Sequence, residues 1–307
     1  MGSCCWKNFL YYLRNVLPSQ YWVEQACAFQ LAMFSMKKSA SRIAILGSGN
    51  IGIALAKGLV KAAIFEPAQI TLTRRNSAAL ASLAQEGYLT SNDNLVAVDQ
   101  ADIVVLAVLP QQLNKVLEGI KGFVKPDSHL IISVISGVSC ADIRKELGVE
   151  VPVVRAMPNT AISIGQSMTC VASDCASEEQ MKLVEELFDT VGSTIRINEE
   201  LMTSATALCA CGIAFFLRSI RAASQGGTEI GFHAHDALRM AAQTAKGAAD
   251  LLLQLASHPE QEIDKVTSPK GCTIAGLNEM EHNGFSSAMI KGIKLSAEKA
   301  GTLYKES

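Results

Sequence analysis

The sequence predicts an α/β protein in which an N-terminal domain with a doubly wound sheet is followed by an all-helical C-terminal domain. Short apolar runs alternate with helix-like segments as far as residue 198, which is typical of β-α repetition. A glycine-rich turn directly follows the first run. From residue 199 the alternation stops, and long segments rich in Ala, Cys and Gly take its place. We therefore expect domains at 37–198 and 199–307, with 1–36 as an extension outside both.

Composition excludes several classes of protein. The 307 residues suit two domains of roughly 100–200 residues each. The formal net charge of -2 excludes a strongly basic nucleic-acid binder, so no nucleic-acid partner is expected. Charged residues make up 18% of the chain, whereas roughly 25% is usual for soluble domains. The low share of charge predicts surface that is buried between subunits, and hence a homo-oligomer.

The nine cysteines show no spacing typical of a metal site. Their number is odd and no C-x-x-C occurs. We predict no metal centre and interpret the cysteines as reduced thiols of a cytoplasmic protein.

The first 36 residues differ from the rest, since they carry both tryptophans. They lack the early basic cluster of a signal peptide, and no small-x-small cleavage site follows an apolar run. Their apolar stretch at 26–34 is too short to span a bilayer, which takes about 20 residues. No membrane partner is therefore expected. Either Met36 is the working start or the segment is a loosely attached extension.

A nucleotide-binding turn follows the first predicted strand, 42–46. It reads Gly47-Ser48-Gly49-Asn50-Ile51-Gly52, which is G-x-G-x-x-G between a strand and a helix. The first glycine permits the tight turn, the second lets a pyrophosphate approach the backbone, and the third lets helix and strand pack closely. Free N–H groups at the helix N-terminus favour the phosphates. These features indicate a dinucleotide-binding domain of the Rossmann type.

The residues after the second predicted strand, 69–73, indicate which dinucleotide is bound. NAD-binding domains usually place an acidic residue there to bind the ribose 2′-hydroxyl. This chain has Arg74, Arg75 and Asn76 instead. Guanidinium groups suit a 2′-phosphate. NADP(H) is therefore the preferred cofactor, with NAD(H) as the second possibility.

Further β-α units complete the predicted sheet. The carboxyl end of the strand at 103–108 is where a cofactor meets a parallel sheet, so Ala107, Val108, Leu109 and Pro110 are candidate cofactor contacts. The other predicted strands are 130–135, 151–155, 168–172 and 194–197, and the predicted helices of this half are 53–63, 77–86, 111–120, 140–147 and 177–190.

The C-terminal half is predicted to contain long helices at 201–224, 235–256 and 285–299. The first is apolar on every side, which indicates burial, most simply between subunits. The substrate is expected in a cleft between the two halves.

A turn at 266–271, before a helix that begins near Cys272, has the features of an anion site. The hydroxyls of Thr267, Ser268 and Thr273 surround the helix N-terminus. Free backbone N–H groups and hydroxyl donors at such a place suit a small carboxylate.

The chain resembles the pyrroline-5-carboxylate reductase family over roughly residues 40–300. The likeness rests on the glycine turn, on Val154-Arg155-Ala156-Met157-Pro158-Asn159-Thr160, on the helical stretch 206–215, and on residues 266–277 followed by Glu281 and Gly284-Phe285. The last patch is close to the family pattern D-x-V-T-S-P-G-G-T-T-I-A-G-L, and 241–249 is similar to A-x-Q-T-x-x-G-A-A.

This resemblance implies NADPH-dependent reduction of 1-pyrroline-5-carboxylate to L-proline, by hydride transfer to a cyclic imine. It implies that Ser268, the backbone at Cys272, and Thr273 bind the substrate carboxylate, with Thr273 as the catalytic hydroxyl at the ring nitrogen. Asn159 and Thr160 are expected to shape the cleft, with Met157 and Asn159 also near the cofactor. Helices of a second subunit are expected to complete the pocket of a homodimer or larger ring.

The chain departs from the family pattern at several positions. Leu109 stands where the family has Lys, Ala161 where it has Pro, and Lys270 and Cys272 where it has Gly and Thr; residues 208–215 replace S-G-S-G-P-A-Y. Two alternatives therefore remain: a catalytically weakened NADP(H)-binding paralogue acting as sensor or scaffold, and a related reductase of another small carboxylate. A β-hydroxyacid dehydrogenase is disfavoured because residues 201–225 contain no Lys as proton donor.

Overall fold

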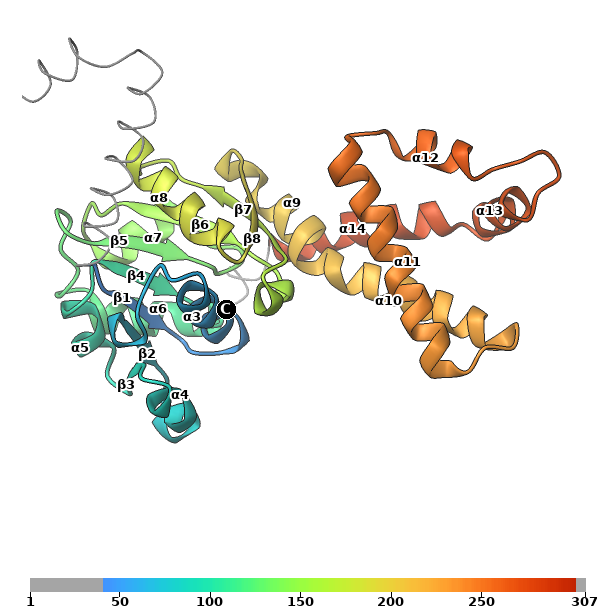
Figure 1. The fold of residues 1–307 in the computed structure, drawn as a ribbon. Helices are drawn as coiled ribbons and strands as arrows, with labels where there is room; N and C mark the ends of the chain where they lie inside the picture. The colour runs from blue at the N-terminus through green and yellow to red at the C-terminus, as the bar shows by residue number, and fades with distance from the viewer. Residues whose placement is uncertain (1–40, 302–307) are drawn as a thin grey trace, which may run out of the picture.

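The computed structural model describes residues 41–301, which form a sheet-containing half and an elongated helical half (Figure 1). The interpretations of residues 1–36 lie outside this range. The predicted fold class is confirmed, because helices flank a mainly parallel sheet in the first half and only helices follow it in the second.

The sheet has eight strands in the order β3-β2-β1-β4-β5-β6-β7-β8. The chain moves outward from β1 in one direction and restarts beside β1 with β4, so the switch point for ligand binding lies between these two strands. Strands β1 to β6 are parallel, β7 is antiparallel to β6, and β8 is parallel to β7. Their bounds are β1 Ile43–Leu46, β2 Ile70–Thr73, β3 Leu89–Ser91, β4 Ile103–Leu106, β5 Leu130–Ser133, β6 Val153–Met157, β7 Ser167–Ala172 and β8 Gly192–Arg196.

Each face of the sheet has its own apolar core. Along β1, Ile43 and Ile45 point to one core, while Ala44 and Leu46 point to the other, as the two-residue period of a strand requires. Leu59 and Phe188 join the first core from the helices on that face. The helices of this half are α3 Asn50–Lys61, α4 Ala81–Gln85, α5 Asn94–Asp99, α6 Pro110–Ile120, α7 Cys140–Leu147 and α8 Glu178–Asp189.

Among the strands and α-helices of the sheet-containing half, two short elements were not predicted. Strand β3 has three residues, all at least partly exposed, so it carries no apolar run. Helix α5 has six residues and begins where the Asp93 carboxylate accepts a hydrogen bond from the N–H of Leu95, 2.8 Å away. The predicted helix at 77–86 is wrong in its first part, because Ser77–Leu80 is a 3-10 turn before α4. Helix α3 begins inside the glycine turn, three residues earlier than predicted.

The helical half begins at Glu199. A 3-10 turn, a short helix, one π-helical segment and a long helix follow one another without a break, as η4 Glu199–Leu201, α9 Met202–Ala205, η5 Thr206–Cys211 and α10 Gly212–Glu229. The remaining helices are α11 Ala234–Leu255, α12 Pro259–Lys265, α13 Cys272–His282 and α14 Phe285–Ala300. Helix α14 runs back towards the sheet, while α12 and α13 lie at the far end (Figure 1).

Within one chain the helical half leaves much apolar surface exposed. Helix α10 buries only Gly212 and Ser224. Phe216 is 61% exposed and Leu253 is 82% exposed. The burial predicted for 201–224 is therefore only partly supplied by the chain itself, because α11 packs against α10 but leaves most of its apolar side chains exposed. A second chain is the simplest source of such cover.

Candidate functional site: a dinucleotide pocket at the sheet edge

The glycine turn is held tightly between β2 and β4. The N–H groups of Gly47 and Ser48 donate to the carbonyl of Thr73, at 3.3 and 2.9 Å. Gly47 has φ +98°, and a Cβ there would lie 2.6 Å from the carbonyl oxygen of Ala107. A Cβ on Gly52 would lie 2.7 Å from the carbonyl oxygen of Gly47. Both positions therefore require glycine, for backbone conformation at the first and for close packing at both.

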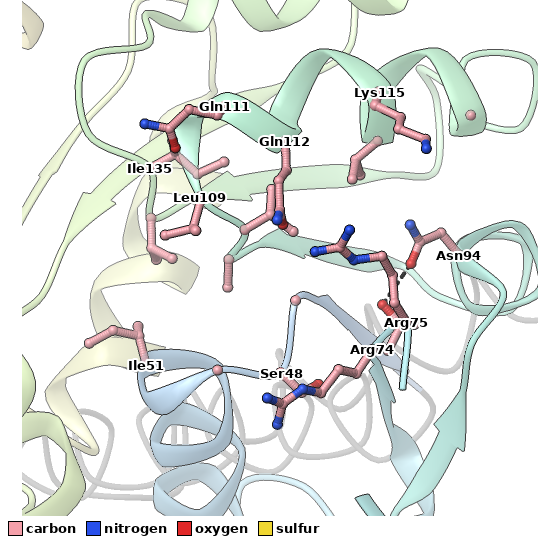
Figure 2. Close-up of a pocket in the computed structure, with 18 of the residues that line it drawn as sticks. Ser48, Ile51, Arg74, Arg75, Asn94, Leu109, Gln111, Gln112, Lys115 and Ile135 are labelled. Carbon is pink, nitrogen blue, oxygen red and sulfur yellow. Dashed lines mark hydrogen bonds between the residues drawn. The ribbon is translucent and has the colours of Figure 1, made fainter. Parts of the chain in front are cut away.

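A cavity of about 1520 Å³ opens at this edge of the sheet (Figure 2). It exceeds the roughly 300–1,000 Å³ of ordinary small-ligand pockets, so an extended dinucleotide has room. Twelve residues expected to contact the cofactor line it: Gly47, Ser48, Gly49, Asn50, Ile51, Arg74, Arg75, Asn76, Ala107, Val108, Leu109 and Pro110. Gly52 does not line it, since it packs beneath the turn.

The turn has the features of a pyrophosphate site. A Cβ on Gly49 would meet nothing within 4 Å, so the backbone there is open to a ligand. The hydroxyl of Ser48 is buried and has no hydrogen-bond partner among the described residues. Helix α3 begins at this point without a side-chain cap. Free N–H groups and an unpartnered hydroxyl at a helix N-terminus suit an anionic phosphate.

Cationic side chains from two elements line the end of the pocket beside β2. Arg74 and Arg75 follow β2, and Lys115 points from α6 towards the wall with Arg75 and Asn94 (Figure 2). The Asn94 amide oxygen accepts a hydrogen bond from the Thr73 hydroxyl at 2.6 Å. Among the lining residues the one carboxylate is Asp93, which already caps α5. This end of the pocket therefore carries net positive charge.

Sequence reasoning missed Asn94, Gln112, Lys115, Ile135 and Ser136, all of which line the pocket. They come from α5, α6 and the loop after β5, which only the strand order brings beside the glycine turn. One signal was available: Gln112 and Lys115 follow Leu109 at spacings of three residues, which places all three on one face of a helix.

Met157, Asn159 and Thr160 do not line the pocket, although Met157 contacts a residue that does. Ser136, a lining residue, has its hydroxyl 3.8 Å from the Met157 sulfur. The Asn159 side chain accepts from the N–H of Ala161 at 3.0 Å and so caps the 3-10 turn η3, Thr160–Ile164. Its amide nitrogen donates to the Cys209 carbonyl at 3.3 Å. Asn159 thus links the sheet half to the helical half.

The turn at 266–271 lies away from the pocket of its own chain. Ser268 and Cys272 are exposed and Thr273 is half-buried, and α13 is at the end of the helical half remote from the sheet (Figure 1). No pocket-lining residue comes from beyond Ser136 in the described part of the chain. Within one chain, the residues predicted to bind the cofactor therefore lie together in the pocket. The residues predicted to bind the substrate, Ser268, Cys272 and Thr273, lie away from it.

Two details of this turn differ from the sequence interpretation. The Thr267 hydroxyl donates to the carbonyl of Ile263 at 2.8 Å, so it is engaged by α12 and is not one of the anion-site donors. Lys270 has φ +58°, a left-handed conformation that glycine adopts without strain. The family pattern has glycine at this position, and this chain keeps the backbone shape with a lysine.

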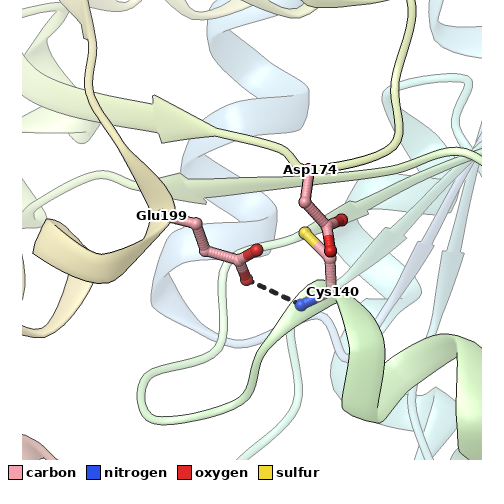
Figure 3. A group of neighbouring side chains, drawn as sticks. All are labelled: Cys140, Asp174 and Glu199. Atoms are coloured by element: carbon pink, nitrogen blue, oxygen red, sulfur yellow. Dashed lines mark hydrogen bonds between the residues drawn. The ribbon is translucent and has the colours of Figure 1, made fainter.

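One side-chain group among residues 41–301 has donor types that could bind a cation: Cys140, Asp174 and Glu199, whose ligand atoms lie within 4.8 Å of one another (Figure 3). Both carboxylates already face guanidinium groups. Asp174 lies 2.9 Å from Arg144, which holds the pKa of that carboxyl below its usual range, and Glu199 lies 3.2 Å from Arg155. Because the arginines neutralise the carboxylates, we interpret the group as an ion-pair network.

A glycine-turn pocket at the switch point of a Rossmann-type sheet, followed by a helical domain, defines a dinucleotide-dependent oxidoreductase. Comparisons with known proteins narrow this class. Residues 199–303 match the family model described as "Pyrroline-5-carboxylate reductase dimerisation". Residues 42–137 match a model described as "NADP oxidoreductase coenzyme F420-dependent".

Two reductases of Dictyostelium discoideum are similar to the chain. Pyrroline-5-carboxylate reductase 2 is 50% identical over 279 residues, which cover 86% of this chain and 93% of that protein. Pyrroline-5-carboxylate reductase 1 is 54% identical over 283 residues, covering 88% of this chain and 51% of that longer protein. The chain therefore spans about half the length of one of these relatives and nearly all of the other.

Solved structures agree. A pyrroline-5-carboxylate reductase from Coxiella burnetii superposes with a TM-score of 0.79 at 29% identity, covering 86% of this chain and 99% of that one. A pyrroline carboxylate reductase of Plasmodium falciparum, crystallised with NADP bound, gives 0.77 at 25% identity, covering 86% and 98%. The chain belongs to the pyrroline-5-carboxylate reductase family, which confirms the resemblance.

Family membership also accounts for the apolar helix. The stretch Glu199–Glu229 is the one described helix long and apolar enough to cross a membrane, and 28% of its most apolar window is buried. The same stretch lies inside the region that matches the dimerisation model. The apolar character of this stretch is therefore consistent with a place in the dimerisation domain.

Proposed function

We propose that the chain reduces 1-pyrroline-5-carboxylate to L-proline with NADPH. The observation that carries this proposal is the 50% identity to a named pyrroline-5-carboxylate reductase over 93% of that protein's length. The oxidoreductase pocket is the independent structural support, since a glycine turn with an open pyrophosphate site is present at the sheet edge. Residues 37–198 would be the cofactor domain and 199–307 the substrate and dimerisation domain.

The cofactor would be held by three parts of the pocket. The turn Gly47 to Ile51 would hold the pyrophosphate, with the N–H groups at the start of α3 and the Ser48 hydroxyl as donors. Arg74, Arg75 and Asn76 would bind the 2′-phosphate, which makes NADP(H) the preferred cofactor over NAD(H). Residues 107–110 would border the nicotinamide end, with Met157 and Asn159 behind them. Bound NADPH would supply the hydride for the imine carbon.

The substrate would bind at the turn before α13. Exposed N–H groups at the start of α13, including that of Cys272, and the Ser268 hydroxyl would hold its carboxylate. The Thr273 hydroxyl would hydrogen-bond the ring nitrogen and help to keep it protonated, since an iminium carbon accepts hydride more readily than an imine. Asn159 and Thr160 would shape the other side of the cleft.

A second copy of the chain would join these two sites. The turn of one protomer lies far from its own pocket, while the apolar faces of α10 and α11 are open to a partner. We propose that the partner's turn completes each pocket, so that neither site works in an isolated protomer. The assembly would be a homodimer or a larger ring built from such dimers.

The compartment proposed for this enzyme is the cytoplasm. All six cysteines among the described residues are free thiols, as a reducing compartment requires. Neither nucleic acid nor membrane is proposed as a partner.

The test is a turnover assay on the purified chain. NADPH and pyrroline-5-carboxylate are mixed, absorbance at the nicotinamide band is followed, and proline is identified in the products. Stoichiometric loss of NADPH with formation of proline supports the proposal. Tight NADPH binding without turnover would overturn the proposal and favour a sensor or scaffold. That alternative rests on the departures from the family pattern at Leu109, Lys270 and Cys272. Turnover only with a different cyclic imine carboxylate would assign another substrate.

A further inference from the structure

Two cysteine thiols meet at the junction between the halves. Cys170 belongs to β7 and is 4% exposed. Cys209 belongs to the π-helical segment η5 and is half-buried. Their sulfur atoms lie 3.7 Å apart, within hydrogen-bonding distance for two thiols. One thiol thus comes from the sheet and the other from the helical half.

The local environment favours the thiolate form of one partner. The hydrogen bond from Cys170 lowers the pKa of Cys209 to about 7, and burial opposes this effect. The same contact and burial raise the pKa of Cys170. Cys209 is therefore the thiol of the pair that loses its proton first, while Cys170 stays protonated beside it. A partly exposed thiolate next to a second thiol is the arrangement of an oxidisable pair.

We infer that Cys170 and Cys209 form a site of reversible oxidation, with a hydroperoxide as oxidant. The Cys209 thiolate would attack the peroxide oxygen, which breaks the O–O bond and leaves a sulfenic acid on Cys209 and hydroxide. The Cys170 sulfur would then displace the hydroxyl group, forming the S–S bond and losing its proton. The sum is two thiols and one hydrogen peroxide giving one disulfide and two waters. A dithiol reductant reverses it.

A disulfide between Cys170 and Cys209 would disturb the hydrogen bond that Asn159 makes with the Cys209 carbonyl. A disulfide is about 2.05 Å long, so the sulfurs must approach by roughly 1.6 Å from their present 3.7 Å. Cys170 is paired with Met157 on one side and Ile195 on the other, which fixes it within the sheet. Most of the approach would therefore come from Cys209, through its side-chain torsion and the π-helical backbone that carries it. The Cys209 carbonyl accepts the hydrogen bond from Asn159, so that contact would be strained or lost.

The movement also acts on the connection between the halves. Met157, Cys170, Met202 and Ala205 share one apolar cluster, and Cys209 packs on its edge. A covalent bond across this cluster would fix the helical half against the sheet. The oxidised form would thus be the less active one. Formation of the bond is independent of the proposed reduction of pyrroline-5-carboxylate, and only its effect on rate rests on that function.

The experiment compares the full-length chain with single Cys→Ser variants. Protein is treated with a small excess of hydrogen peroxide, blocked with an alkylating reagent, and mapped by mass spectrometry without reduction. We expect a peptide that joins Cys170 to Cys209 and a protein with two fewer alkylated cysteines than the untreated sample. We expect kcat/KM to fall about tenfold, because a shift of an ångström beside reacting groups is worth up to about 100-fold. Dithiothreitol should restore both.

Two variants separate the pair from other thiols. Cys209→Ser should keep the activity and resist inactivation by peroxide. The matched control is Cys211→Ser, two residues away in the same segment, which should respond like the unaltered chain. A disulfide that maps elsewhere, such as between Cys140 and Cys175, or Cys209 and Cys170 peptides that remain alkylated after peroxide, would overturn the inference. A disulfide at this pair in a protein without turnover would leave the inference standing and remove the proposed function instead.

Discussion

The Arg155 guanidinium and the Glu199 carboxylate form an ion pair that joins the sheet to the first residue of the helical half. Their Nη1 and Oε1 atoms lie 3.2 Å apart, and the two side chains are 6% and 17% exposed. Glu199 also accepts the N–H of Cys140 at 2.7 Å, which connects it to the start of α7. Nε and Nη2 of Arg155 are buried without a partner among the described residues. Glu199 is therefore the main counter-charge of a buried cation.

Loss of that counter-charge should destabilise the protein. Glu199→Gln should lower the free energy of unfolding by about 3 kcal/mol, because removing one partner leaves an uncompensated buried charge. The double variant Arg155→Met, Glu199→Gln should regain part of the lost free energy of unfolding, because it leaves no unpaired buried charge. Chemical denaturation of all four forms measures the coupling. The control is Lys57→Met, which breaks an ion pair that is about half exposed and should change stability by less than about 1 kcal/mol. Equal losses at both sites would contradict this account.

Two glycines of the turn should respond differently to the same substitution. Gly52→Ala should destabilise the fold by about 1–3 kcal/mol, since its methyl group would lie 2.7 Å from the Gly47 carbonyl. Gly49→Ala should lower stability by less than about 1 kcal/mol, because its methyl group meets nothing within 4 Å. It should nevertheless weaken NADPH at least about tenfold by occupying the pyrophosphate approach. Thermal denaturation and NADPH titration check both. Unchanged NADPH affinity in Gly49→Ala would exclude this turn as the phosphate site.

The cations of the pocket should distinguish NADPH from NADH. Arg74→Ala, Arg75→Ala and Lys115→Ala should each weaken NADPH about tenfold, since a charged hydrogen bond is worth about 1.5–3 kcal/mol. Affinity for NADH, which lacks the 2′-phosphate, should change less than about twofold. Titration with 2′,5′-ADP and with 5′-AMP isolates the same difference without turnover. Lys121→Ala is the control, because Lys121 lies at the end of α6 outside the pocket lining. Equal weakening of both cofactors would contradict a 2′-phosphate role.

The Thr273 hydroxyl should affect the rate more than binding. Thr273→Ala should lower kcat about 100-fold, the lower range for loss of a proton-transfer group, while Thr273→Ser should keep most of the activity. Thr267→Ala is the matched control from the same turn, because its hydroxyl is already bonded to the Ile263 carbonyl. Steady-state kinetics with pyrroline-5-carboxylate measures kcat and KM separately. A rate in Thr273→Ala equal to that of the unaltered chain would remove Thr273 from the active site.

Elements with an apolar run or clear helix-end signals were predictable, and elements without these signals were not. Helix α7 was predicted at its observed bounds, because Ser139 caps it and Gly148 ends it in a left-handed conformation. Strand β3 carries no apolar run and owes its place to pairing with β2. The antiparallel direction of β7 was likewise outside the reach of local patterns, since it depends on how the chain returns from η3.

The sequence by itself determined the glycine turn, the cations that follow β2 and the change from sheet to helices, because each depends on neighbours within a few residues. Only the tertiary structure decided that Lys115 faces the same pocket as Arg75, since the strand order places α6 beside β2's end. It also decided that helix α13, which carries Thr273, lies away from the pocket of its own chain. Such relationships depend on the packing of segments far apart in sequence, which no local pattern records.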